Sequence, residues 1–216
     1  MREMLRGLLA VALLSAGAAG CNAIGVAAYA ASGGAKVPPE YKLQNRATLV
    51  LVENYENPEV FTVPAERLGR NITGELTDSK VATFIDPEKA SDLKSADPTD
   101  FRKMDIPAVG RAVGARQVIY VNLVKFTTDS PLGGDRFVGK AEARVKVVDA
   151  NTGQTIWPLD SSGGRDIKYE TKVTQGIDDT NLTIVQDQLC QTFGEKIAKL
   201  FHETPLADQS IDEAAK

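Results

Sequence analysis

The strict alternation of side chains between Phe137 and Asp149 limits the fold more than any other feature of the sequence. Small or apolar residues alternate there with charged ones. Because residues two apart in a strand share a face, the pattern predicts a strand with one buried and one solvated face. The apolar face carries Ala141, Ala143, Val145 and Val147, and the solvated face carries Lys140, Glu142, Arg144 and Lys146.

Three other segments predict strands of the same sheet. Ala47–Glu53 reads ATLVLVE, a nearly continuous apolar run that is typical of a strand covered on both faces. Val118–Phe126 reads VIYVNLVKF and is the strongest strand signal in the chain. Val81–Ile85 is short and rich in strand-forming residues. The sheet is therefore expected to combine strands that are covered on both faces with the Phe137–Asp149 strand, which has one solvated face.

Helical spacing of apolar residues predicts the covering layers. Leu68, Ile72 and Leu76 recur at helical spacing after Pro64, and residues 100–114 are also expected to be helical. A long amphipathic helix is predicted near the carboxyl end, from Leu182, Val185, Leu189, Phe193, Ile197 and Leu200. The predicted fold class is α/β, a mixed sheet with flanking helices in two layers or a three-layer-like arrangement, in the order β-α-β-(α)-β-β-β-α.

A turn follows the alternating strand. Asn151, Thr152 and Gly153 predict a tight connection in which Gly153 takes a positive φ. Gln154–Leu159 is the predicted hairpin partner, with Trp157 packed in the core rather than exposed as a binding anchor. Residues 169–174 either extend that strand or form another.

The phrase VKVVDANTGQTIW at residues 145–157 resembles a group of bacterial envelope lipoprotein domains. The group includes the periplasmic domain of the curli-secretion channel lipoprotein, the outer-membrane activators of penicillin-binding proteins and the amino-terminal domain of the Tol translocation β-propeller protein. In these domains a strand ending in D-x-x-T-G turns into a strand with a bulky apolar residue. Asp149, Thr152, Gly153 and Trp157 match that phrase.

The resemblance covers roughly residues 46–203 and implies the fold and the structural roles of those four residues. Gly114, Ala115 and Arg116 are similar to the group's entry into its central strand, with Arg116 in place of the usual aspartate. Residues 127–136 are expected to be a loop, too short for the hairpins with which the curli channel builds its membrane barrel. A secretion pore is therefore not expected.

The amino terminus predicts export. Arg2 and Arg6 precede an uncharged run from Gly7 to Ala19, as in a secretory signal, and the run is too short to span a bilayer comfortably. Ala18-Ala19-Gly20-Cys21 resembles the lipobox of bacterial lipoproteins, which implies that Cys21 carries lipid and becomes the first mature residue. The alternative is an ordinary signal peptide that leaves a free cysteine.

The expected organisation follows from that cleavage point. Residues 1–20 form the signal peptide, 21–45 the lipidated anchor and tether, 46–203 the α/β globular domain and 204–216 a disordered tail. Asn22 stands where lipoproteins of the inner membrane carry aspartate. The resemblance therefore implies that the protein is located on the periplasmic side of the outer membrane.

Little in the composition favours catalysis or nucleic-acid binding. Removal of residues 1–20 changes the formal net charge from −4 to −5, which gives no electrostatic reason to bind nucleic acid. The only histidine, His202, is expected to cap the last helix, and Cys190 is expected to be a partly buried inert thiol. The acidic residues of segment 86–105 do not follow a calcium-loop spacing and are interpreted as a solvated surface. We expect no enzyme activity, no metal site and no cofactor.

The sequence thus predicts a membrane-anchored periplasmic lipoprotein that acts as a non-catalytic accessory or structural component of a cell-envelope complex. Its partners are expected to be the membrane, through the lipid, and an unidentified envelope protein, with segments 86–99 and 127–136 presented as surface loops. Homo-oligomerisation stays open. The alternative is a periplasmic carrier or sensor that binds a small ligand between sheet and helices.

Overall fold

The computed structural model describes residues 36–130, 135–161, 163–176 and 182–206. The signal, Cys21 and most of the tether and tail lie outside these ranges. The described chain divides into two compact units. In the smaller one, β1 (Lys36–Val37) pairs antiparallel with β8 (Thr204–Pro205), and Lys36 forms an ion pair with Glu203 at 3.5 Å. Regular structure was not expected in either segment.

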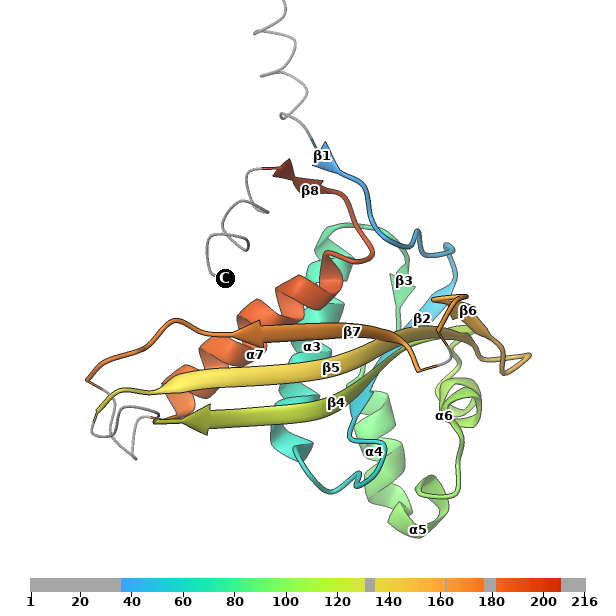
Figure 1. Cartoon of the computed structure of the whole chain (residues 1–216). Coiled ribbons are helices and arrows are strands. Elements are labelled where there is room, and N and C mark those ends of the chain that lie inside the picture. Colours follow the sequence, from blue (N-terminus) through green and yellow to red (C-terminus); the bar gives the residue numbers. More distant parts are fainter. Residues whose placement is uncertain (1–35, 131–134, 162, 177–181, 207–216) are drawn as a thin grey trace, which may run out of the picture. The chain divides into compact units, whose positions relative to one another are not determined.

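The larger unit, Pro39–His202, contains an open mixed sheet (Figure 1). Its strands are β2 (Ala47–Glu53), β3 (Thr83–Phe84), β4 (Gln117–Asp129), β5 (Val138–Asp149), β6 (Thr155–Trp157) and β7 (Arg165–Glu170). The strand order is β3-β2-β4-β5, and both β6 and β7 pair with β5 along different stretches. β2 is parallel to β3 and β4, whereas β5 is antiparallel to β4, β6 and β7. The predicted α/β class with a mixed sheet is confirmed.

One face of the sheet is covered by two long helices, α3 (Thr62–Asp78) and α7 (Leu182–Ala198). Leu68, Ile72 and Leu76 of α3 are fully buried there, as their spacing predicted. The helices approach closely at Gly194 of α7, where a Cβ atom would lie 3.1 Å from the Cβ of Asn71. The main core lies between this helix pair and the sheet.

Three short helices cover part of the opposite face. These are α4 (Glu88–Ala96), α5 (Pro98–Phe101) and α6 (Ile106–Ala112), and they pack on Leu49 and Leu51 of β2 and on Val118 of β4. Over these strands the molecule has three layers. The polar segment 86–99, expected as a loop, is therefore mostly helical, and the helix expected over 100–114 is interrupted after Phe101.

The alternation in β5 is confirmed. The four small apolar residues are at most 2% exposed and belong to the main core, whereas Lys140, Glu142, Arg144 and Lys146 are half-buried or exposed. β4 runs on to Asp129, past a register shift between Leu123 and Lys125. Residues 127–129, expected in a loop, thus extend the strand, and residues 131–134 of that loop lie outside the described ranges.

Candidate functional site

The residues of the D-x-x-T-G phrase form the turn after β5. The Asp149 carboxylate accepts hydrogen bonds from the backbone N–H groups of Asn151 and Thr152, and from the guanidinium of Arg46 at 2.8 Å. The Thr152 hydrogen bond is the main cause that holds the pKa of Asp149 below its usual value, and Arg46 adds to it. Gly153 has a φ of 76°, and its N–H donates to the Asp149 carbonyl at 2.9 Å. Through these contacts, the residues of the phrase stabilise the turn after β5.

Trp157 packs at the rim of the main core. Its ring lies 5.9 Å from that of Tyr41 and 5.6 Å from that of Phe201, the latter in an edge-to-face arrangement. Such aromatic pairs add roughly 0.5–1.5 kcal/mol beyond the area they bury. The tryptophan is half-buried and holds β6 against the core.

Several carboxylates of segment 86–105 cap helices. Asp97 accepts from the Asp100 N–H at the start of α5, and Asp105 accepts from the Ala108 N–H at the start of α6. Asp86 accepts from the Glu88 N–H just before α4. A cap of this kind contributes about 1 kcal/mol to helix stability. The acidic composition of the segment thus explains why it forms short helices rather than the expected loop.

Of the two other residues singled out by their chemistry, Cys190 is buried and His202 is half-buried. Cys190 is 1% exposed, and burial raises the pKa of its thiol to about 11, which agrees with an inert role. His202 lies beyond the last residue of α7, Ala198, with its Nε2 3.7 Å from a carboxylate oxygen of Glu75 on α3.

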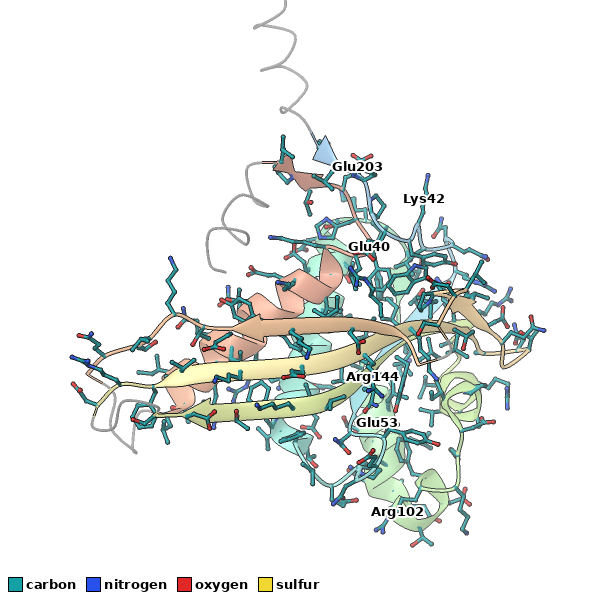
Figure 2. The ribbon with its side chains drawn as sticks, in the orientation of Figure 1. Glu40, Lys42, Glu53, Arg102, Arg144 and Glu203 are labelled. Atoms are coloured by element: carbon teal, nitrogen blue, oxygen red, sulfur yellow. The ribbon has the colours of Figure 1, made fainter. Side chains whose placement is uncertain are left out.

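A cleft opens between the α5–α6 segment and the sheet. A pocket between sheet and helices was the alternative expectation, but none of its residues was predicted from the sequence. Its volume is about 610 Å³. The apolar wall includes Phe101, Met104, Ile106 and Val109, with Leu51 and Val148 from the sheet. Charged and polar groups reach the same space from Glu53, Tyr55, Arg102 and Lys146. Figure 2 shows Glu53 at the end of β2 and Arg102 at the end of α5. The volume lies within the range typical of small-molecule sites.

Tyr120 links two charged groups in this cleft. Its hydroxyl donates to Glu53 Oε1 at 3.1 Å, and the Nζ of Lys146 lies 5.4 Å from the centre of its ring. Burial raises the pKa of Glu53, an effect that the Tyr120 hydrogen bond and the nearby charge of Lys94 partly offset. Burial and the Glu53 charge also raise the pKa of Tyr120, which therefore stays a hydrogen-bond donor. Two groups that line the cleft, the Glu53 carboxylate and the Lys146 ammonium, thus lie beside the buried Tyr120.

The loop after β2 is fixed to β4, which sets the position of Glu53. Asn54 donates from Nδ2 to the Leu123 carbonyl, and the Tyr55 N–H donates to Asn122 Oδ1, both at 2.9 Å. A smaller hollow of about 60 Å³ lies next to Glu53 between α3 and α4, and Lys94 borders it. In the sequence, this site is marked only by Glu53, one charged residue at the end of an otherwise apolar strand. That pattern does not reveal that Tyr120 lies beside Glu53.

Two classes of site were also considered over the described ranges. Within them, no three His, Cys, Asp or Glu side chains gather in a way that could hold a metal ion. The helices of those ranges include none with the length and apolar character needed to cross a membrane.

Comparisons with known proteins give structural neighbours only. No known protein family matches the chain, and no curated protein matches its sequence. Among solved structures, the lipoprotein GNA1162 from Neisseria meningitidis is 12% identical with a TM-score of 0.44, over 69% of this chain and 99% of its own. The PelC dodecamer from Paraburkholderia phytofirmans is 12% identical with a TM-score of 0.36, over 78% and 97%. A hypothetical protein, CT253 from Chlamydia trachomatis, is 13% identical with a TM-score of 0.39, over 72% and 96%.

Proposed function

We propose that this protein is a membrane-anchored periplasmic lipoprotein and a non-catalytic accessory component of a cell-envelope complex. The signal-like segment and the lipobox-like residues before Cys21 support the anchor. The residues between Cys21 and Pro39, where the larger folded unit begins, then separate that unit from the membrane. The protein acts by contact with another envelope protein, and the lipid fixes one end of it to the bilayer, on the outer-membrane side.

The observation that carries the contact function is the uncovered face of β5 and β7. Three ion pairs cross between these strands: Lys140–Glu170 at 3.8 Å, Glu142–Lys168 at 3.2 Å and Arg144–Asp166 at 3.3 Å. No helix of the described ranges packs on this side of β7 or of the Lys140–Arg144 stretch of β5, whereas α6 covers the end of β5 (Figure 1). Exposed pairs of this kind contribute about 0–1 kcal/mol to folding, so stability does not account for the charge pattern. Alternating charges on a flat face instead suit the recognition of a protein partner.

Val124 supplies an apolar contact beside the charges. It is the residue at the register shift of β4 and is 44% exposed, next to the shallow depression formed by Glu142, Arg144, Asp166 and Lys168. A central apolar residue with a charged rim is the usual arrangement of a protein interface. The uncovered face therefore offers a protein partner both charged contacts and an apolar contact.

Photo-crosslinking in cells tests this contact. A photoreactive amino acid replaces Val124, and in a matched control it replaces Val63, which is 64% exposed on α3. We expect one recurrent envelope protein to be joined at position 124 and not at position 63. Crosslinks to a second copy of this chain would instead identify a homo-oligomer, and equal products at both positions, or none at 124, would refute the proposed contact face.

The anchor has its own test. Replacing Cys21 with Ser should abolish acylation and keep the precursor uncleaved, because the thiol is the atom that receives the diacylglycerol. Mass spectrometry of the amino-terminal peptide measures this directly. An unchanged acylated mass in the Cys21→Ser protein would refute the lipoprotein assignment.

A second candidate function is that of a small-ligand carrier or sensor. The cleft beside Glu53 favours it, because a volume of about 610 Å³ lies within the range of roughly 300–1,000 Å³ typical of ligand sites. This function uses the α5–α6 side of the sheet rather than the Val124 region, so the two candidates can be tested independently.

A further inference from the structure

The sheet topology contains a reversal at the carboxyl ends of β2 and β3. From β2 the chain passes through α3 to β3 on one side, and then through α4–α6 to β4 on the other side. α3 and the α4–α6 segment cover opposite faces, so the connections that leave the adjacent strands β2 and β3 diverge. In open α/β sheets, ligands bind in the crevice outside the carboxyl ends of strands where such a reversal occurs.

Glu53 marks this place. It is the last residue of β2 and is paired in register with Asn122 of the parallel strand β4. The smaller hollow, bordered by Lys94 between α3 and α4, lies at this reversal. The large cleft lies over the face of the sheet and reaches the reversal at Glu53, which lines both hollows.

The charges of the cleft indicate which ligand it takes. Its two carboxylates have partners within the fold: Glu53 accepts from the Tyr120 hydroxyl, and Asp105 accepts from the Ala108 N–H. The lining also carries three cationic side chains, Arg102, Lys103 and Lys146, of which only Lys103 forms an ion pair within the described residues, with Asp100 at 3.9 Å. Cations thus outnumber carboxylates in the lining, so the complementary ligand is an anion.

The apolar wall defines the rest of the ligand. Met104, Ile106 and Val109 lie on the helix side, with Val148 on the sheet side. A bare inorganic ion would leave this wall in contact with water, whereas an organic body would bury it at a gain of roughly 25 cal/mol per Å².

We propose that this cleft binds a small organic carboxylate, with its anionic group at Lys146 and Arg102 and its apolar body against Met104, Ile106 and Val148. The inference rests on the second candidate function and specifies its ligand class. It does not depend on the contact face around Val124.

The test compares a charged and a neutral probe of the same shape. The full-length lipidated protein in phospholipid nanodiscs is titrated with 4-phenylbutyrate or with 4-phenylbutan-1-ol, and hydrogen exchange is followed by mass spectrometry. We expect the acid to protect peptides covering residues 101–107 and 146–155, with an affinity about tenfold higher than that of the alcohol, since one charge-assisted contact is worth that factor.

Two variants locate the anion. Lys146→Met keeps the aliphatic contact with Tyr120 but removes the charge, and should weaken 4-phenylbutyrate binding about tenfold with little effect on the alcohol. Lys168→Met removes a charge from the uncovered face and should leave both affinities unchanged.

Each outcome decides a separate point. Equal binding of acid and alcohol in the cleft would keep the carrier function and overturn the anion selectivity. Protection by neither probe, or protection confined to other peptides, would overturn the ligand site itself. An equal loss of acid binding in Lys146→Met and Lys168→Met would overturn the assignment of Lys146 to the anion.

Discussion

Gly153 turns the chain between β5 and β6 with a φ of 76°, whereas Gly74 lies exposed in the interior of α3 with open space around it. The same substitution should therefore have opposite effects. Gly153→Ala should destabilise the protein by about 1–2 kcal/mol, because an L-residue is strained at positive φ. Gly74→Ala should stabilise it by about 1 kcal/mol through helix propensity. Urea unfolding measures both; a neutral Gly153→Ala would contradict the strained turn.

Tyr120→Phe removes the hydrogen bond to Glu53 and should raise the pKa of that carboxyl further, because the bond favours its charged form. Above the folded-state pKa of Glu53, where the carboxyl is ionised, the variant should lose roughly 1.5–3 kcal/mol of stability. The loss should shrink as the pH falls through the folded-state pKa of Glu53, which lies above the ordinary value of 4.5.

Urea unfolding of the Tyr120→Phe protein at pH 7 and pH 4 checks this dependence. Tyr55→Phe is the matched control, because Tyr55 is 70% exposed and its phenol should matter by less than about 0.5 kcal/mol. A loss that is the same at both pH values would show that the hydrogen bond does not depend on the charge of Glu53.

The same residues show what could be predicted from the sequence. Gly153 was found because a positive φ is a local demand that few residues other than glycine meet. The Glu53–Tyr120 pair was missed because 67 residues separate its members, and their contact depends on the parallel register of β2 and β4. Local conformation is encoded by neighbours in the chain, whereas this site is encoded by the pairing of strands.

Among the elements, long periodic ones were predictable and short capped ones were not. α3 and the β5 strand carry several turns or alternations of one pattern, so their packing faces could be derived. α5 and α6 have four and seven residues, too few for a periodic stripe. Their first residues are fixed by the capping carboxylates of Asp97 and Asp105. From composition alone, these two residues were interpreted as part of a solvated acidic surface.

α6 can lie against the sheet only because residue 110 is glycine. A Cβ atom there would come within 2.6 Å of Val118 Cγ2 and 3.2 Å of Ala150 Cβ. Gly110→Ala should therefore destabilise the protein by about 1–3 kcal/mol despite the higher helix propensity of alanine. It should also widen the cleft by displacing α6.

A double-mutant cycle checks the cause. Val118→Ala creates space at the contact, so its combination with Gly110→Ala should be at least about 1 kcal/mol more stable than the two separate losses predict. Denaturant unfolding of the four proteins provides the numbers. If the losses in unfolding free energy were simply additive, the close approach of α6 to β4 would not be the reason that residue 110 must be glycine.

Within the larger unit, the two cores differ in size although they share β2 and β4. The main core joins α3 and α7 to the sheet and contains large, fully buried side chains such as Phe193. The second core joins only short helices to the opposite face and depends on Phe101 and Val109. Because few apolar contacts hold the second layer, residues 86–115 should open without unfolding of the rest.

Native-state hydrogen exchange of two truncations should separate these events. Phe101→Ala should speed exchange mainly within residues 86–115, because it loosens the α4–α6 layer alone. Phe193→Ala should cost about 3–5 kcal/mol and lower protection throughout β2, β4, β5, α3 and α7, because it removes a ring from the core that all of them share. The cleft wall belongs to the less stable layer, so a ligand bound there should slow exchange in residues 86–115 without changing exchange in α7. Equal acceleration of both regions in Phe101→Ala would instead show that the layers unfold as one cooperative unit, and the α5–α6 wall could then not adjust to a ligand independently of the main core.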